Sequence, residues 1–119
     1  MQRIKFSAAD AQAITRYDSH RADSVHLADG QGESHVYVIH FGPDGAIGRH
    51  PTGFCQLFLV VAGDGWVEGG DGQRLQLASG EGVFFERGES HAKGSATGMT
   101  AIMVQADQFA LRTFDPESV

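Results

Sequence analysis

The chain has 119 residues, with nine basic side chains against fifteen acidic ones and a formal net charge of −6. This length allows one domain with a real core, and an acidic surface without a basic cluster argues against nucleic-acid binding because it repels phosphate backbones. A single cysteine, Cys55, rules out an internal disulfide, and no stretch is apolar enough to span a bilayer, so we expect a cytoplasmic protein without membrane contact.

The glycines, 16 in number, separate short segments rich in Val, Ile, Leu and Phe, which is typical of an all-β protein. Only "SAADAQAIT" near the start has the composition of a helix, and it is short. Turn sequences such as "GPDG", "AGDG" and "SGEG" separate the remaining segments, and this spacing predicts a sandwich or jelly roll. In chain order, the expected strands are Ser24–Asp29, Glu33–Phe41, Gln56–Ala62, Gly65–Glu68, Gln73–Ala78, Glu81–Phe85 and Met99–Gln105.

The segment "ESHVYVIHF" is apolar on both of its faces, since Val36, Val38 and His40 alternate with Tyr37 and Ile39. A strand of this kind is expected to be covered on both sides, by the barrel interior and by a second sheet or subunit. We therefore expect a homodimer.

Two segments carry more than patterning, and the first is "DGAIGRHPTGFCQLFLVVAGDG". Gly45 precedes His50, Thr52 follows two residues later, and Gln56 is followed after six residues by Gly63. His50, Thr52 and Gln56 share parity, so period-two alternation places Cys55 on the opposite side of the strand.

The second segment is "GEGVFFERGESHAKGS". Gly80 is followed after five residues by Glu86, and then by Gly88, His91 and Ser95. The spacing of both segments resembles the two sequence motifs of the cupin family, and the likeness extends over about residues 36–105.

The resemblance implies a double-stranded β-helix, a small jelly-roll barrel often paired as a homodimer, here as a single domain over residues 1–119. The side chains of both motifs would then converge in one mouth and form a ligand pocket. The expected lining comprises His50, Thr52, Gln56, Phe58, His91, His40 and Glu86.

A cupin metal site, as the resemblance implies it, uses two histidines and a carboxylate from the first motif and one histidine from the second. This chain keeps His50 and His91, while Thr52 stands at the second histidine position and Gln56 at the carboxylate position. Both replacements weaken affinity for a divalent cation. A site of His50, Gln56 and His91 would still suit Fe, Mn, Ni or Zn, but a metal-free pocket is favoured.

Three functions remain open at this point. The first is a module that binds a small molecule, because "FCQLFLVVAGDGWV" is similar to the sensory domains of AraC-type regulators. The second is a metal-dependent dioxygenase, isomerase or decarboxylase that uses His50, Gln56 and His91. The third is a metal-free epimerase with a histidine as acid or base, Tyr37 as its partner, and Arg49 or Arg87 as an anion anchor.

Overall fold

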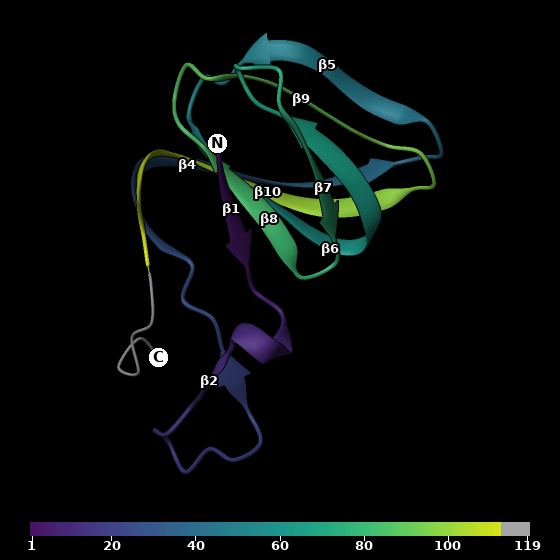
Figure 1. The fold of residues 1–119 in the computed structure, drawn as a ribbon. Helices are drawn as coiled ribbons and strands as arrows, with labels where there is room; N and C mark the ends of the chain where they lie inside the picture. The colour runs from purple at the N-terminus through teal and green to yellow at the C-terminus, as the bar shows by residue number, and fades with distance from the viewer. Residues whose placement is uncertain (113–119) are drawn as a thin grey trace.

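The computed structural model describes residues 1–112, and it confirms the all-β class (Figure 1). The final part of the expected domain, residues 113–119, lies outside the described residues. No helix in residues 1–112 is long and apolar enough to cross a membrane. The elements are β1 (Gln2–Lys5), the 3-10 helix η1 (Ala8–Asp10), β2 (Gln12–Ala13), β3 (Asp23–Ser24), β4 (Ala28–Phe41), β5 (Gly45–Pro51), β6 (Cys55–Glu68), β7 (Arg74–Ala78), β8 (Glu81–Phe85), β9 (Ser90–Ser95) and β10 (Met99–Leu111).

One turn expected from the sequence is absent within β6. The sequence "AGDG" predicted a break between two strands, but β6 runs through it without interruption. The bend there is made by Gly63, whose φ of +72° favours glycine, and a Cβ at this position would lie 2.3 Å from the carbonyl oxygen of Gly98. The chain therefore turns from one layer into the other within a single strand.

Other boundaries also differ from the expected ones. The segment Ser24–Asp29 is not a strand, because β3 ends at Ser24 and β4 begins at Ala28. The helical composition of "SAADAQAIT" yields only η1, followed by β2. Strands β1, β5 and β9 were not expected at all, and β5 and β9 carry the two motif histidines.

Apart from β2 and β3, which pair only with each other, the strands form two layers that share β6 (Figure 1). The first half of β6 pairs with β8 and β10, in the order β1-β8-β6-β10-β4. The second half pairs with β7 and β9, and β9 pairs in turn with β5. Between the layers lies a core that includes Phe41, Phe58, Val67, Leu77 and Phe85.

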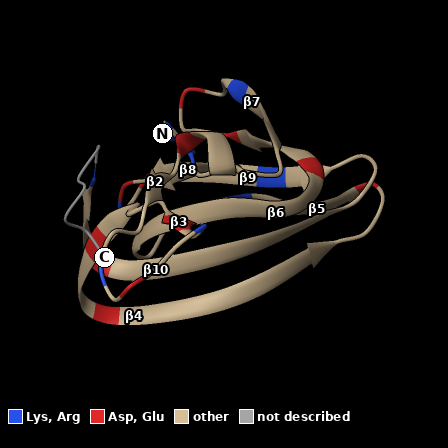
Figure 2. Ribbon diagram, turned by 90° about the horizontal axis from the view of Figure 1, so that it is seen from below, with Lys and Arg blue, Asp and Glu red and all other residues tan. Residues whose placement is uncertain are grey.

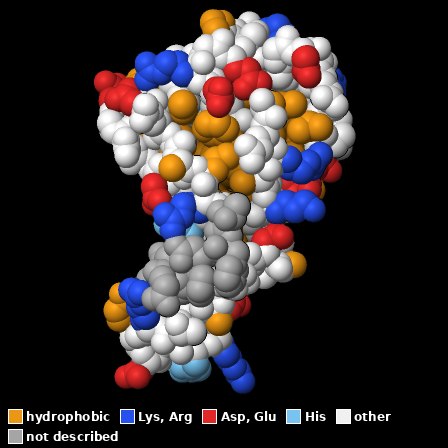
Figure 3. Space-filling model, turned by 60° about the vertical axis from the view of Figure 1, so that its left-hand side comes forward, with side chains coloured by type: hydrophobic (Ala, Val, Ile, Leu, Met, Phe, Trp, Pro, Cys, Tyr) orange, Lys and Arg blue, Asp and Glu red, His pale blue; other side chains and the backbone are white. Residues whose placement is uncertain are grey.

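Strand β4 lies at the edge of its layer, and residues 1–112 leave its face with Val36 and Val38 largely uncovered. Val36 and Val38 are 68% and 59% exposed. The middle parts of β4 and β10 carry no charged residue (Figure 2), and Figure 3 shows hydrophobic side chains gathered on one face of the barrel with charged groups around them. The homodimer stays a prediction.

Candidate functional site

The two motif histidines lie side by side on paired strands. His50 of β5 and His91 of β9 are direct cross-strand partners, and a register shift precedes His50. Their Nε2 atoms are 3.3 Å apart, and the rings meet edge to face with centroids separated by 4.7 Å. The rings of Phe85 and His91 also meet edge to face, with centroids 4.5 Å apart.

The proton positions of this pair follow from their partners. His50 Nδ1 lies 2.7 Å from the carbonyl oxygen of Gly48, which can only accept, so this nitrogen carries a proton. In neutral His50 the Nε2 is then an acceptor, and His91 Nε2 must donate to it. His91 Nδ1 is left as an unprotonated acceptor, and it is buried without a hydrogen-bond partner among the described residues.

His91 is fully buried, whereas His50 is exposed. The pKa of His91 is lowered from 6.5 to about 3, mainly by burial and to a smaller extent by Lys93, His50 and Arg49. His91 is therefore neutral at physiological pH, in agreement with the proton positions above.

Lys93 shares the face of β9 with His91, because the two residues are separated by one position. Its side chain is 1% exposed, and its Nζ donates a hydrogen bond of 2.5 Å to Oε1 of Gln56, which is 2% exposed. The Nζ also lies 5.0 Å from the ring centre of Phe58 and 5.3 Å from that of Phe85. Burial lowers the pKa of Lys93 from 10.5 to about 7.

Thr52 has a structural task. Its hydroxyl donates to the carbonyl oxygen of Glu86 at 2.8 Å and accepts the backbone N–H of Gly88 at 3.0 Å. Its own backbone N–H donates to the carbonyl oxygen of Glu89. Thr52 therefore fastens the turn between β8 and β9 and has no hydroxyl proton left for the histidine pair.

Two residues expected in the pocket lie elsewhere. His40 is exposed on β4, where its ring contacts the hydroxyl of Thr100 on the neighbouring strand. Glu86 is exposed after the end of β8, and its backbone rather than its carboxylate engages Thr52 and Glu89. The structure thus brings four of the expected residues into one group: His50 contacts His91, and Lys93 contacts Gln56 and Phe58. Phe85 lies beside both His91 and Lys93. The His40 ring and the Glu86 carboxylate do not belong to this group.

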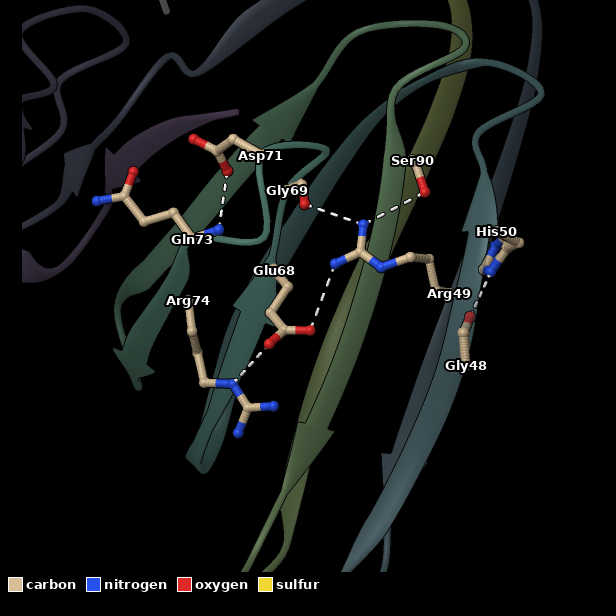
Figure 4. A network of polar contacts seen from close by, with 9 residues as sticks. All are labelled: Gly48, Arg49, His50, Glu68, Gly69, Asp71, Gln73, Arg74 and Ser90. Atoms are coloured by element: carbon tan, nitrogen blue, oxygen red, sulfur yellow. Dashed lines mark hydrogen bonds and ion pairs between the residues drawn. The ribbon is translucent and has the colours of Figure 1, made fainter.

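Arg49 belongs to a separate polar network on β5 and β6 (Figure 4). Its guanidinium donates to the carbonyl oxygen of Gly69, the hydroxyl of Ser90 and a carboxylate oxygen of Glu68. Glu68 also accepts a hydrogen bond from Arg74. Figure 4 shows the Arg49 side chain extending toward this network and the His50 ring lying apart from it. Arg49 is consequently not a free anchor for an anionic substrate.

Comparison with known proteins fits this geometry. The sequence profile of a family described as "Cupin" matches residues 18–118, most of the chain. The chain belongs to the cupin family. No curated protein matches this cupin in sequence.

Solved structures share the fold at low identity. A Cupin 2 conserved barrel domain protein from Salinispora arenicola is 17% identical, with a TM-score of 0.58 over 82% of this cupin and 74% of that chain. A cupin superfamily protein from Desulfitobacterium hafniense is 12% identical, with a TM-score of 0.59 over 69% and 77%. A predicted oxalate decarboxylase from Thermotoga maritima is 20% identical, with a TM-score of 0.54 over 65% of each chain. These likenesses confirm the double-stranded β-helix.

The donors of this cupin do not fit the metal site that the family resemblance implies. A histidine that binds a metal through Nε2 normally donates its Nδ1–H to an acceptor, and His50 does so while His91 has none. The Gln56 oxygen is taken by Lys93, and Thr52 is engaged with the turn. Among residues 1–112, no three His, Cys, Asp or Glu side chains are grouped to hold an ion.

A hollow of about 900 Å³ is lined by residues of β4, β6, β8 and β10 and by Glu86, and its lining contains neither His50 nor His91. Its lining includes Cys55, Phe84 and Phe109, together with Arg87 and Asp107, whose ion pair measures 2.8 Å. Cys55 accordingly does not line the histidine site.

Lys93 and Phe85 are the two site residues that the motif spacing did not supply. Alternation from His91 would have found Lys93, since residues two apart on a strand face the same side. A signal was present in "SHAKGS", where a lone charge sits among small residues. Phe85 gave no signal beyond that of an ordinary core aromatic residue.

Proposed function

We propose that this cupin binds a small organic molecule beside the His50–His91 pair and does so without a metal ion. The observation that carries the proposal is the Nδ1 of His91, an acceptor that is buried and has no partner among residues 1–112. A buried polar atom without a partner costs about 1–3 kcal/mol. A ligand hydroxyl that donates to Nδ1 would remove this cost.

The residues around the histidine pair also support a small organic ligand with a hydroxyl group. The fully buried rings of Phe58 and Phe85 form an apolar wall beside the neutral His91 and the amine of Lys93, and a ligand would reach this group past the exposed His50. Small-molecule sites typically combine an apolar wall with a few directed polar groups. Because His50 is exposed while His91 is buried, a ligand would approach from the β5 side.

The enzyme alternatives have less support. A metal-dependent dioxygenase, isomerase or decarboxylase would need a set of metal ligands that is incomplete here. The Gln56 oxygen is bonded to Lys93, and the Thr52 hydroxyl is bonded to the Glu86 carbonyl. An epimerase would need Tyr37 and an anion anchor near the histidines. Tyr37 is 48% exposed on β4, and Arg49 is held by Glu68.

The test is a thermal-shift screen of the metal-free protein against neutral sugars, small alcohols and hydroxy acids. A compound that binds only the folded state stabilises it by RT ln(1 + L/Kd), where L is the ligand concentration, so the melting temperature rises with the logarithm of L above Kd. We expect a hydroxyl-bearing hit to lose its shift in His91→Ala and to keep it in the control His40→Ala. A shift that survives in His91→Ala, or the lack of any hit across the panel, would refute the proposal.

A further inference from the structure

The amide oxygen of Gln56 stands at the position where the family resemblance implies a metal-binding carboxylate, and its partner is an amine. Lys93 Nζ donates to Oε1 at 2.5 Å, and both side chains are almost completely buried. We propose that Lys93 takes the place of a metal ion as the partner of residue 56 and thereby keeps this barrel metal-free. The proposal deepens the proposed function and rests on the metal-free character of that site.

The surroundings of Lys93 make this an arranged contact rather than a stray side chain. Lysine is almost never fully buried unless it is paired. Here the amine has an amide oxygen on one side and the rings of Phe58 and Phe85 within about 5.3 Å. Both an amide oxygen and an aromatic face attract a cation. The site thus offers an ammonium group the kind of electrostatic stabilisation that it would otherwise offer a metal.

The contact does not depend on the charge state of the lysine. An ammonium group and a neutral amine both donate an N–H, so Oε1 of Gln56 is occupied in either form. An ammonium would also repel a divalent cation directly. Removing Lys93 alone leaves a weak neutral oxygen at position 56, whereas removing it beside a carboxylate creates a set of two histidines and one carboxylate.

Four full-length proteins test the proposal: wild type, Gln56→Glu, Lys93→Met and the double variant Gln56→Glu/Lys93→Met. Each is incubated with Zn(II) or Co(II) at neutral pH and desalted, and the metal per chain is measured. Zn(II) affinity is then compared by competition with a chromogenic chelator. We expect the double variant to bind Zn(II) about tenfold or more tightly than Gln56→Glu. Because these two variants carry the same carboxylate, the difference isolates the lysine.

Equal metal binding by Gln56→Glu and by the double variant would overturn the proposal, as would stoichiometric metal in the wild type. Thermal melting without metal gives a second readout if the double variant does not fold. If Lys93 partners residue 56, Gln56→Glu, which keeps an acceptor for the amine, should melt at a higher temperature than Gln56→Met, which has none. Equal melting temperatures of these two variants would show that Lys93 does not partner residue 56 and would overturn the proposal. The ligand screen with His91→Ala is read independently, so the two proposals can fail separately.

Discussion

Strands β5 and β9 are paired neighbours with opposite environments. Most of β5 is exposed, while every residue of β9 after Ser90 is buried. The cause is position: β5 pairs with β9 alone, whereas β9 lies between β5 and β6. His50 is therefore exposed to solvent and has a carbonyl partner. His91, across from it, is shielded from solvent and has a ring nitrogen without a partner among residues 1–112.

This contrast shows that the partners of a side chain decide its chemistry. The two histidines have matching places in matching motifs, but only His50 has the acceptor that a metal ligand normally has. Lys93 follows the same logic, because a burial that would be costly elsewhere is offset by Gln56 and two aromatic rings. Substitutions around the buried β9 should therefore lower the stability of the fold strongly, and substitutions on the exposed β5 should lower it weakly.

The largest effect is expected from Phe85→Ala, which removes the β8 ring that packs against buried His91. Phe85 is fully buried and touches His91, so its removal should lower the free energy of unfolding by about 3–5 kcal/mol. Urea denaturation measures the change. The control is Phe54→Ala, which removes a partly exposed phenylalanine outside the core cluster and should cost clearly less.

The next largest effect is a dependence of the free energy of unfolding on pH that is caused by Lys93. Its pKa in the folded protein is lowered, so the unfolded chain binds this proton more readily and folding is penalised below about pH 7. The penalty should diminish as the pH rises from about 7 toward 10.5, by up to about 1.4 kcal/mol per pH unit. Urea titrations across this range should show the rise in the wild type and lose it in Lys93→Met. An identical slope in both proteins would contradict a buried lysine.

His91 should produce a similar dependence at acid pH. Because its folded-state pKa is lowered to about 3, unfolding takes up a proton, and stability should fall as the pH drops from about 6.5 toward 3. Comparing wild type with His91→Leu in this window isolates the contribution, since leucine cannot be protonated. If both proteins lose stability at the same rate, His91 is not held neutral by the fold.

The smallest effect is expected from His50→Ala on the exposed β5. His50 is exposed, and water can replace it as the partner of His91 Nε2, so the loss of stability should be about 1 kcal/mol or less. Urea denaturation at pH 7 checks this. A loss as large as that of Phe85→Ala would mean that the exposed and the buried sides of the histidine pair do not differ as described.

The sequence was sufficient to predict the fold class, because the spacing of glycines and histidines in two motifs is itself the signature of the barrel. It was not sufficient for β5 and β9. "GAIGRHP" lacks alternation because most of β5 is exposed, and "SHAKGS" lacks large apolar residues because other elements fill the space. A Cβ at Gly94 would lie 2.5 Å from the Trp66 ring, so the bulk comes from β6.

The site was predicted in part for a similar reason. Spacing identified His50, Gln56 and His91 as a group, and the structure places the two histidines in contact. Spacing cannot reveal hydrogen-bond partners, so the Gly48 carbonyl, the unpaired Nδ1 of His91 and the amine on Gln56 were all outside its reach. Those three features are the grounds on which we propose a metal-free pocket, the alternative that the motif residues already favoured.

The most direct test of this account is elemental analysis of the purified wild-type protein, before and after incubation with Fe(II), Mn(II), Ni(II) and Zn(II) followed by desalting. We predict a metal content near zero under every condition, because Lys93 occupies the Gln56 oxygen and the Thr52 hydroxyl is bonded to the turn after β8. One metal ion per chain, lost in His50→Ala and in His91→Ala, would contradict the account.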